Sequence, residues 1–310
     1  MGVKPPTRLA LWTALWTVYL VWGSTYLAIK VSVETMPPLL SAGARFVTAG
    51  LLLAGVLTVL GRSLRVTRRE ALAAGGLGVA LLTFGVGIVT LAETRIDSSV
   101  AAMIAGSVPL QVVLMRIVSG DSVARSTRLA AFVGLIGLGL IVVPQGSHGG
   151  STALGLLLML GASISWSTGS FVSGRLPLPS DPFVATVYEM LGGGAVLATL
   201  ALALGEGRDL DGVSAGSFAA WTYLVLAGSL IGFTAYAWLL RSAPISLVVT
   251  HQYVNPLVAI ALGTAFLDER PTSTMLVGAA VVVGAVFATV RTERPPAGPR
   301  DVAAVPARAR

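Results

Sequence analysis

The sequence contains no cysteine, so disulfide frameworks and thiolate chemistry are excluded. Cysteine usage therefore gives no indication of the redox compartment. Charged residues are also scarce: they make up 11% of the 310 residues, whereas 55% are hydrophobic. Soluble domains carry about 25% charged residues, so this composition excludes an ordinary pair of soluble domains. Lysine and arginine exceed aspartate and glutamate by 21 to 14. The basic excess lies in short connectors and in the C-terminal tail, which indicates a membrane surface and no nucleic-acid partner.

Several motifs of enzyme chemistry are missing as well. The sequence has no Gly-Lys pair followed by Ser or Thr, no acidic Mg²⁺ cluster and no histidine-rich run. Of the two histidines, His148 falls in a connector, and no second ligand stands at metal spacing beside His251. We therefore expect no catalytic residues, no cofactor, no metal site and no ATP-driven step within this chain, which argues against an enzyme.

The sequence does contain long apolar runs. A helix rises about 1.5 Å per residue, so roughly 20 apolar residues cross a bilayer core about 30 Å thick. The runs are continuous and too long for the alternating strands of a membrane barrel. They predict an all-α integral membrane protein with ten spans, of which the fifth and tenth are the shortest: 9–29, 38–60, 71–92, 98–119, 129–143, 153–173, 183–204, 218–240, 246–267 and 273–290. The first is interpreted as a retained signal-anchor helix.

Lysine and arginine are distributed unevenly between the two sides of these spans. With an even number of spans, fifteen of the 21 fall on the side that holds both termini and four on the other side. This predicts a multi-pass protein of the inner (cytoplasmic) membrane with both termini cytoplasmic. The tail from Arg291 onward is rich in proline and poor in apolar residues, which predicts disorder.

The chain also matches itself. At an offset of 144 residues Trp22 falls on Trp166 and Arg45 on Glu189, and at an offset of 147 Gly85 falls on Gly232 and Pro109 on Pro256. Each unit would hold five spans, and an odd number places the second unit upside down in the membrane. Inverted repeats around a central cavity are typical of secondary transporters that work by alternating access.

Two stretches resemble a known family. The segment 21–27 (VWGSTYL) with Met36-Pro37-Pro38 and Arg45-Phe46, and the segment 255–259 (NPLVA) with 266–271 (FLDERP), are similar to EamA-type permeases of the drug/metabolite transporter superfamily. The resemblance implies ten helices in two five-helix repeats, with the fifth and tenth outside the cavity, and movement of small metabolites. One departure is Gly120-Asp121, where such permeases often carry Gly-Glu. The expected division is a cytoplasmic N-terminus at 1–8, repeats at 9–143 and 153–290, a connector at 144–152 and a disordered tail at 291–310.

Arg45 and Glu189 are the charges expected deep inside spans, apart from Arg116 near the inner end of the fourth. An ionised group in the bilayer costs from about 2.5 kcal/mol upward, so it needs a partner, water or a function. Both stand on mildly polar helix faces, and their depths place them above and below one cavity. Cavity lining or gating, a structural ion pair and snorkelling all remain open for them.

Further candidates for cargo binding or gating are polar or aromatic residues within spans. Gln111, His251 and Asn255 are suited to hydrogen-bonding either cargo or a neighbouring helix, and His251 is also suited to carrying a proton. Trp22, beside Ser24, and Trp166 are matched by the repeat and predict a cavity wall, a gate or plain packing. Pro109 and Pro256 interrupt spans and predict hinges or fixed bends. Small residues four apart in the fifth and tenth spans suit packing or a homodimer contact.

Together these patterns predict a secondary transporter of small metabolites, with amino acids or related zwitterions as one cargo class and export as the expected direction. Opposite charges at Arg45 and Glu189 would suit a zwitterion, and Glu189 is also a candidate for proton exchange. The rival interpretations are a passive channel, a membrane enzyme acting on lipid-linked groups, and a membrane scaffold or receptor that does not transport.

Overall fold

The computed structural model describes residues 7–120, 123–145, 152–208, 212–243, 248 and 251–292. Throughout these ranges the regular structure is helical and no strand occurs. Most of the expected connector and nearly all of the expected disordered tail lie outside the described residues. The helices are α1 (Arg8–Ser32), α2 (Pro38–Val59), α3 (Arg68–Gly78), η1 (Val79–Gly87), α4 (Ile88–Glu93), α5 (Ser98–Ala105), α6 (Val108–Val118), α7 (Arg125–Gln145), α8 (Ala153–Ser173), α9 (Pro182–Ala203), η2 (Glu206–Arg208), α10 (Ala215–Tyr223), η3 (Leu224–Phe233), α11 (Thr234–Ser242), α13 (His251–Phe266) and α14 (Ser273–Thr292).

The helices follow the apolar runs closely. Six continuous helical stretches are long and apolar enough to cross a membrane: Pro38–Val59, Arg68–Glu93, Ser98–Val118, Ala153–Ser173, Pro182–Ala203 and Ala215–Leu239. The fifth run is longer than expected, because the polar residues Arg125–Arg128 form the first turn of α7 and add no apolar signal to the sequence.

Local sequence explains where the helices begin and end. Thr67 and Glu70 form a capping box at the start of α3, and Asp181 caps α9 by accepting the N–H of Phe183 at 3.0 Å. After α2 and α9 the chain turns at Gly61 and Gly205, whose φ values are 72° and 92°. Only glycine adopts this conformation without strain, which ends both helices sharply. These two glycines are 144 residues apart in the sequence.

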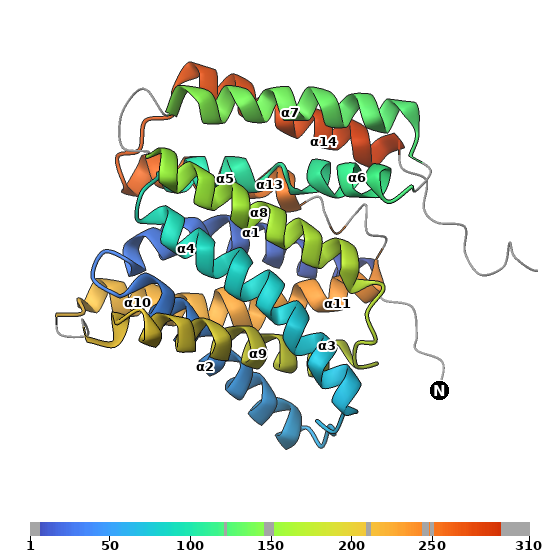
Figure 1. Ribbon diagram of the computed structural model, residues 1–310, viewed down its shortest axis with the longest axis vertical. Helices are drawn as coiled ribbons and strands as arrows, with labels where there is room; N and C mark the ends of the chain where they lie inside the picture. The colour runs from blue at the N-terminus through green and yellow to red at the C-terminus, as the bar shows by residue number, and fades with distance from the viewer. Residues whose placement is uncertain are drawn as a thin grey trace, which may run out of the picture.

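Helices α7 and α14 lie side by side at one edge of the molecule, away from α1 and α2 (Figure 1). They approach closely through small residues: a Cβ at Gly137 would lie 2.8 Å from Val281, and one at Gly278 would lie 2.8 Å from the carbonyl oxygen of Gly137. Gly137 of α7 thus packs inside the chain, against α14. A Cβ at Gly284 of α14 would meet nothing within 4 Å, and the homodimer contact stays a prediction.

Helices α2 and α9 form the other close pair. A Cβ at Gly43 would lie 2.6 Å from the backbone nitrogen of Ala198, and one at Gly194 would lie 2.8 Å from that of Val47. No side chain larger than hydrogen fits between these backbones without a shift. This close crossing packs α9 against α2 and so limits which residues of α9 can face the interior.

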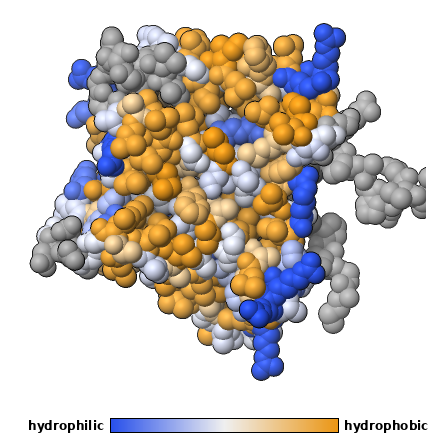
Figure 2. Space-filling view, in the orientation of Figure 1, coloured by the Kyte–Doolittle hydropathy of each residue, from blue (hydrophilic) through white to orange (hydrophobic). Residues whose placement is uncertain are grey.

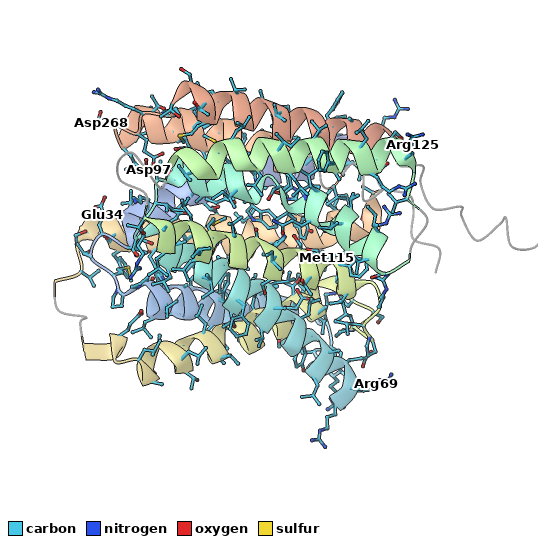
Figure 3. The ribbon with its side chains drawn as sticks, turned by 45° about the horizontal axis from the view of Figure 1, so that its top comes forward. Glu34, Arg69, Asp97, Met115, Arg125 and Asp268 are labelled. Carbon is cyan, nitrogen blue, oxygen red and sulfur yellow. The ribbon has the colours of Figure 1, made fainter. Side chains whose placement is uncertain are left out.

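The outer surface is apolar. Figure 2 shows hydrophobic residues over most of the visible face, with hydrophilic groups toward the edges. Leu51, Phe132 and Phe218 are among many large apolar side chains that are more than half exposed. A soluble protein rarely exposes so much contiguous apolar surface, whereas lipid tails cover it at no cost. In Figure 3 Glu34, Asp97 and Asp268 lie at one end of the helices, and Arg69 and Arg125 lie at the opposite end.

The two prolines predicted as hinges behave differently. The chain breaks between α5 and α6 at Gly106-Ser107, and Pro109 takes the second position of α6, where its missing N–H costs nothing. Pro256 stays inside α13, with no break there. A Cβ on Gly106 would lie 3.3 Å from Pro256, so the break in one span packs on the proline of the other. The fourth span is therefore broken just before its proline.

Candidate functional site

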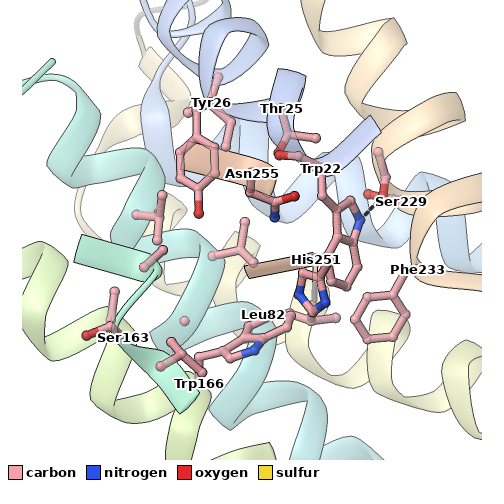
Figure 4. Close-up of a pocket in the computed structure, with 18 of the residues that line it drawn as sticks. Trp22, Thr25, Tyr26, Leu82, Ser163, Trp166, Ser229, Phe233, His251 and Asn255 are labelled. Carbon is pink, nitrogen blue, oxygen red and sulfur yellow. Dashed lines mark hydrogen bonds between the residues drawn. The ribbon is translucent and has the colours of Figure 1, made fainter. Parts of the chain in front are cut away.

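The interior contains a cavity of about 110 Å³ (Figure 4). Its walls come from α1, α2, η1, α4, the α5–α6 junction, α8, η3 and α13. None of its lining residues belongs to α7, α9 or α14. The volume holds several water molecules or part of a small metabolite. The absence of α7 and α14 from the lining agrees with the expectation that the fifth and tenth spans stand outside the cavity.

An aromatic cluster forms one wall. The ring of Trp22 lies 6.0 Å from Trp166 in an edge-to-face arrangement, 6.2 Å from Phe233 and 5.2 Å from the ring of His251. The indole N–H of Trp22 donates to the carbonyl oxygen of Gly228 at 3.1 Å. Edge-to-face pairs of this kind are favourable beyond the area they bury. Trp22 is therefore held between the α8 side and the η3 side of the cavity.

Glycines in two π-helical segments make room for the indoles. A Cβ on Gly85 of η1 would lie 3.2 Å from Trp166, and one on Gly232 of η3 would lie 2.7 Å from Nε1 of Trp22. Each segment widens the helix by one residue per turn, a feature found at functional sites more often than elsewhere. The sequence comparison pairs these glycines at an offset of 147 but gives no signal for the π-helical geometry.

Arg45 lies in the cavity wall, and 5% of its surface is exposed. Its Nε donates to the hydroxyl of Ser229 at 2.8 Å, and its guanidinium lies 5.0 Å from the ring centroid of Phe46. No acidic side chain forms an ion pair with it among the described residues. The remaining guanidinium N–H groups are thus placed to hold an anionic group in the cavity.

Polar groups of α13 form the opposite part of the lining. Nδ1 of His251 lies 2.8 Å from the carbonyl oxygen of Val248, and its Nε2 lies 3.0 Å from the amide nitrogen of Gln252. If the amide of Gln252 donates, the ring is neutral with its proton on Nδ1. Oδ1 of Asn255 is buried with no hydrogen-bond partner in the part of the chain that the structure describes. An acceptor in this position is available to cargo.

Of the eight residues predicted to bind cargo or gate it, five line the cavity: Trp22, Arg45, Trp166, His251 and Asn255. Gln111 lies behind the wall, where its amide nitrogen donates to Ser107 and Ser163 and its Oε1 accepts from Ser167. This is the interhelical bonding that the sequence left as its alternative role. The hydroxyl of Ser24 pairs with the carbonyl of Val21 and with Tyr223 on the far side of α1.

Glu189 differs from its expected position. It is buried, with 7% of its surface exposed, but it is not among the residues that line the cavity. The reason is the close packing of α9 on α2 and α3: the backbone carbonyl of Glu189 meets the position that a Cβ on Gly78 would occupy. Arg45 and Glu189 therefore do not lie above and below one cavity in this structure.

The sequence also misses one buried acid. Glu93 directly follows the third apolar run, 71–92, but it is the last residue of α4 and is fully buried. Ser229, which also lines the cavity, escapes notice because serines are common in membrane helices. The signal available for Glu93 was its position: a charge directly after an apolar run, with no polar residue between.

A family model confirms the resemblance seen in the sequence. The model of the EamA-like transporter family matches residues 10–143 and again residues 153–291. The chain belongs to the EamA-like transporter family. It is accordingly a transporter and a multi-pass membrane protein.

Individual EamA-like relatives span nearly the whole chain. The uncharacterized inner membrane transporter YedA of Escherichia coli K12 is 38% identical over 282 residues, which cover 90% of each chain. The probable amino-acid metabolite efflux pump of the same strain is 22% identical and covers 88% of this chain and 92% of its own length. A solved crystal structure superposes with a TM-score of 0.64 at 20% identity, covering 91% of this chain and 98% of the other, which supports the fold alone.

Proposed function

We propose that this EamA-like protein is a secondary transporter that moves small metabolites across the cytoplasmic membrane by alternating access. Its ten spans form two inverted five-helix repeats, and the cavity lies between them. The observation that carries this proposal is a buried arginine, Arg45, in a cavity whose walls come from both segments that the family model matches. A buried cation facing an internal cavity is the arrangement expected of a binding site for a polar cargo.

Equivalent positions in the two units support the inverted repeat. Trp22 and Trp166 meet in the wall of the cavity, and each indole packs on the glycine of the other unit: Trp22 on Gly232 and Trp166 on Gly85. The π-helical segments η1 and η3 also fall at corresponding positions. A rotation that relates two five-helix units in this way exchanges the two sides of the membrane.

The charge distribution supports an inside location for both termini and for the end that carries Arg69 and Arg125, because cytoplasmic loops hold the excess of basic residues (Figure 3). The opposite end, with Glu34, Asp97 and Asp268, would then face outward.

The cargo we propose is a small molecule with a carboxylate, and amino acids are the first class to test. Arg45 would bind the carboxylate through its guanidinium N–H groups, and Oδ1 of Asn255 would accept a hydrogen bond from an ammonium group. This assigns to Asn255 the part that the sequence suggested for Glu189, since Asn255 lines the cavity. One relative is named a probable amino-acid metabolite efflux pump, which supports this class and the outward direction.

The test is transport by purified protein in proteoliposomes, with a mixture of amino acids and neutral metabolites read by mass spectrometry. Arg45→Gln should impair movement of amino acids more than of neutral compounds. Arg125→Gln, an exposed arginine at the start of α7, is the matched control and should leave both unchanged. Equal loss for both classes in Arg45→Gln would contradict the proposed cargo. Single-channel current would favour a passive channel, and binding without translocation would favour a receptor or scaffold.

A further inference from the structure

Glu93 is the most isolated charged group that the structure describes. Its side chain is 0% exposed, and both of its carboxylate oxygens lack a hydrogen-bond partner among the described residues. Burying an ionised carboxylate without donors costs several kcal/mol. The site must therefore supply either a counter-ion or a proton.

Lys30, a cation that acts electrostatically on Glu93, does not pair with it. Lys30 of α1 interacts electrostatically with Glu93, but its ammonium donates to the backbone carbonyls of Glu93 at 2.8 Å and of Ile96 at 2.7 Å. No ion pair forms between the two side chains. Lys30 instead caps the carboxyl end of α4, where the helix dipole and the free carbonyls favour a cation.

An acid that also acts electrostatically on Glu93, Glu269, is committed to another partner. Glu269, from the segment before α14, accepts hydrogen bonds from the backbone N–H and the hydroxyl of Ser98, both at 2.7 Å, and from the N–H of Ser99 at 3.0 Å. This carboxylate caps the start of α5. Glu93 thus lies between the end of α4, which Lys30 caps, and the start of α5, which Glu269 caps.

The other charged or titratable groups that face Glu93 are Tyr26 of α1 and Arg45 of α2. The remaining elements packed against α4, which are α5, α8 and η1, contain no titratable side chain. No group of three or more His, Cys, Asp or Glu capable of holding a metal ion occurs among the described residues, so a divalent cation lacks ligands there. A proton is the ligand that neutralises the carboxylate and needs no further partner.

The site is adjacent to the cavity. Val89 lines the cavity one helical turn before Glu93, and Tyr26, which faces Glu93, lines it as well. A rearrangement that opens this end of the helices would bring water to the carboxylate.

We propose that Glu93 is a proton-binding site that couples the movement of cargo to the movement of protons. While it is enclosed as in this structure, the side chain is a neutral carboxylic acid with the proton on one oxygen. When the surrounding helices open to water, the O–H bond breaks, the proton passes to water and the carboxylate is left charged beside Lys30. This inference rests on the proposed transport function.

The first experiment reads the proton itself. Infrared spectra of the purified protein at neutral pH should contain the C=O stretch of a protonated, buried carboxylic acid. Glu93→Gln should lose that band. Glu34→Gln, which removes an exposed carboxylate beyond the end of α1, should keep it. A band that persists in Glu93→Gln would overturn the proposal.

The second experiment reads coupling in proteoliposomes, with the amino-acid mixture as the probe. When one proton moves per cargo molecule, a pH difference of about one unit supports up to about tenfold accumulation. Wild type, Glu34→Gln and Glu93→Asp should accumulate cargo when a pH difference is imposed. Glu93→Gln should lose this accumulation yet still exchange labelled for unlabelled cargo, since exchange requires no release of the proton.

The outcomes separate the two proposals. If Glu93→Gln keeps pH-driven accumulation, or if a sodium gradient drives wild type instead, the coupling role of Glu93 is wrong and transport stands. If Glu93→Gln loses exchange as well, Glu93 serves cargo and not coupling, which also overturns the inference. If wild type moves no compound at all, the proposed function fails, and the infrared band still decides whether Glu93 binds a proton.

Discussion

The indole of Trp22 meets the indole of Trp166 edge to face, with ring centroids 6.0 Å apart and an interplanar angle of 86°. The two residues come from α1 and α8, the first helix of each matched segment, and stand 144 positions apart in the sequence. Their contact joins the two halves of the chain at the cavity wall, so it is the natural place to test whether the halves act together.

We expect a double-mutant cycle on Trp22→Leu and Trp166→Leu to give a coupling energy of about 0.5–1.5 kcal/mol, as measured for aromatic pairs in contact. Thermal unfolding of the purified variants in detergent supplies the measurement. If the two substitutions add within about 0.3–0.5 kcal/mol, the contact contributes no specific interaction.

Gly232→Ala should destabilise the protein and reduce transport. The new Cβ would lie 2.7 Å from Nε1 of Trp22, and relieving such overpacking costs about 1–3 kcal/mol. Gly139→Ala is the control, because a Cβ at this helical position meets nothing within 4 Å and alanine favours helix by up to about 1 kcal/mol. Equal melting temperatures and transport rates for the two variants would show that the space beside Trp22 is not needed.

Arg45→Lys should weaken amino-acid binding although it keeps the positive charge. Lysine lacks the planar guanidinium and the Nε–H that donates to the hydroxyl of Ser229. A loss of about 1.5 kcal/mol in binding free energy corresponds to roughly tenfold weaker binding. Concentration dependence of transport gives the apparent affinity, with Arg125→Lys as the matched control. Wild-type affinity in Arg45→Lys would mean that charge alone serves the cargo.

Glu269→Ala should lower the free energy of unfolding by about 1–3 kcal/mol, because three donors at the start of α5 lose their charged acceptor. Glu34→Ala removes an exposed acid at the same end and should change stability little. Denaturation in detergent compares the two. Similar small effects from both substitutions would contradict a capping role for Glu269.

We expect the stability of the protein to depend on pH through the carboxyl group of Asp97. Burial raises the pKa of Asp97 above its ordinary value of 3.8, repulsion from Glu269 raises it further, and Lys30 opposes both. The folded protein then keeps this proton at pH values where the unfolded chain has released it, so stability falls as the pH rises through that window. Asp97→Asn should raise the melting temperature at neutral pH and make no difference below about pH 3.8, where both states are protonated. An equal difference at both pH values would contradict this cause.

Much of the helical layout follows from hydropathy. Residues 153–173 form α8 over the predicted range, and α2 and α9 end within one residue of the predicted limits. Apolar length dictates these elements because a chain in lipid satisfies its backbone within each helix. The breaks inside spans were harder to predict: the interruption at Gly106-Ser107 and the π-helical segments depend on packing between helices.

The candidate site was predicted only in part, because the sequence gives the depth of a residue in the membrane and not the direction in which its side chain points. Hydropathy gives the depth of Arg45 and Glu189 along their helices, but it does not give the direction in which each helix face points. Glycine contacts turn α9 toward α2 and α3, which moves Glu189 away from the cavity, while Arg45 stays on its wall.

The sequence alone determined that this protein lies in a membrane, that its chain repeats and that it resembles one transporter family, because composition, apolar length and the order of matched residues are properties of the linear chain. Only the tertiary structure decided which polar groups share the cavity and that the carboxylate of Glu93 is buried without a hydrogen-bond partner among the described residues. Those facts depend on how closely helices approach one another, and that distance is set by small side chains meeting across the bundle.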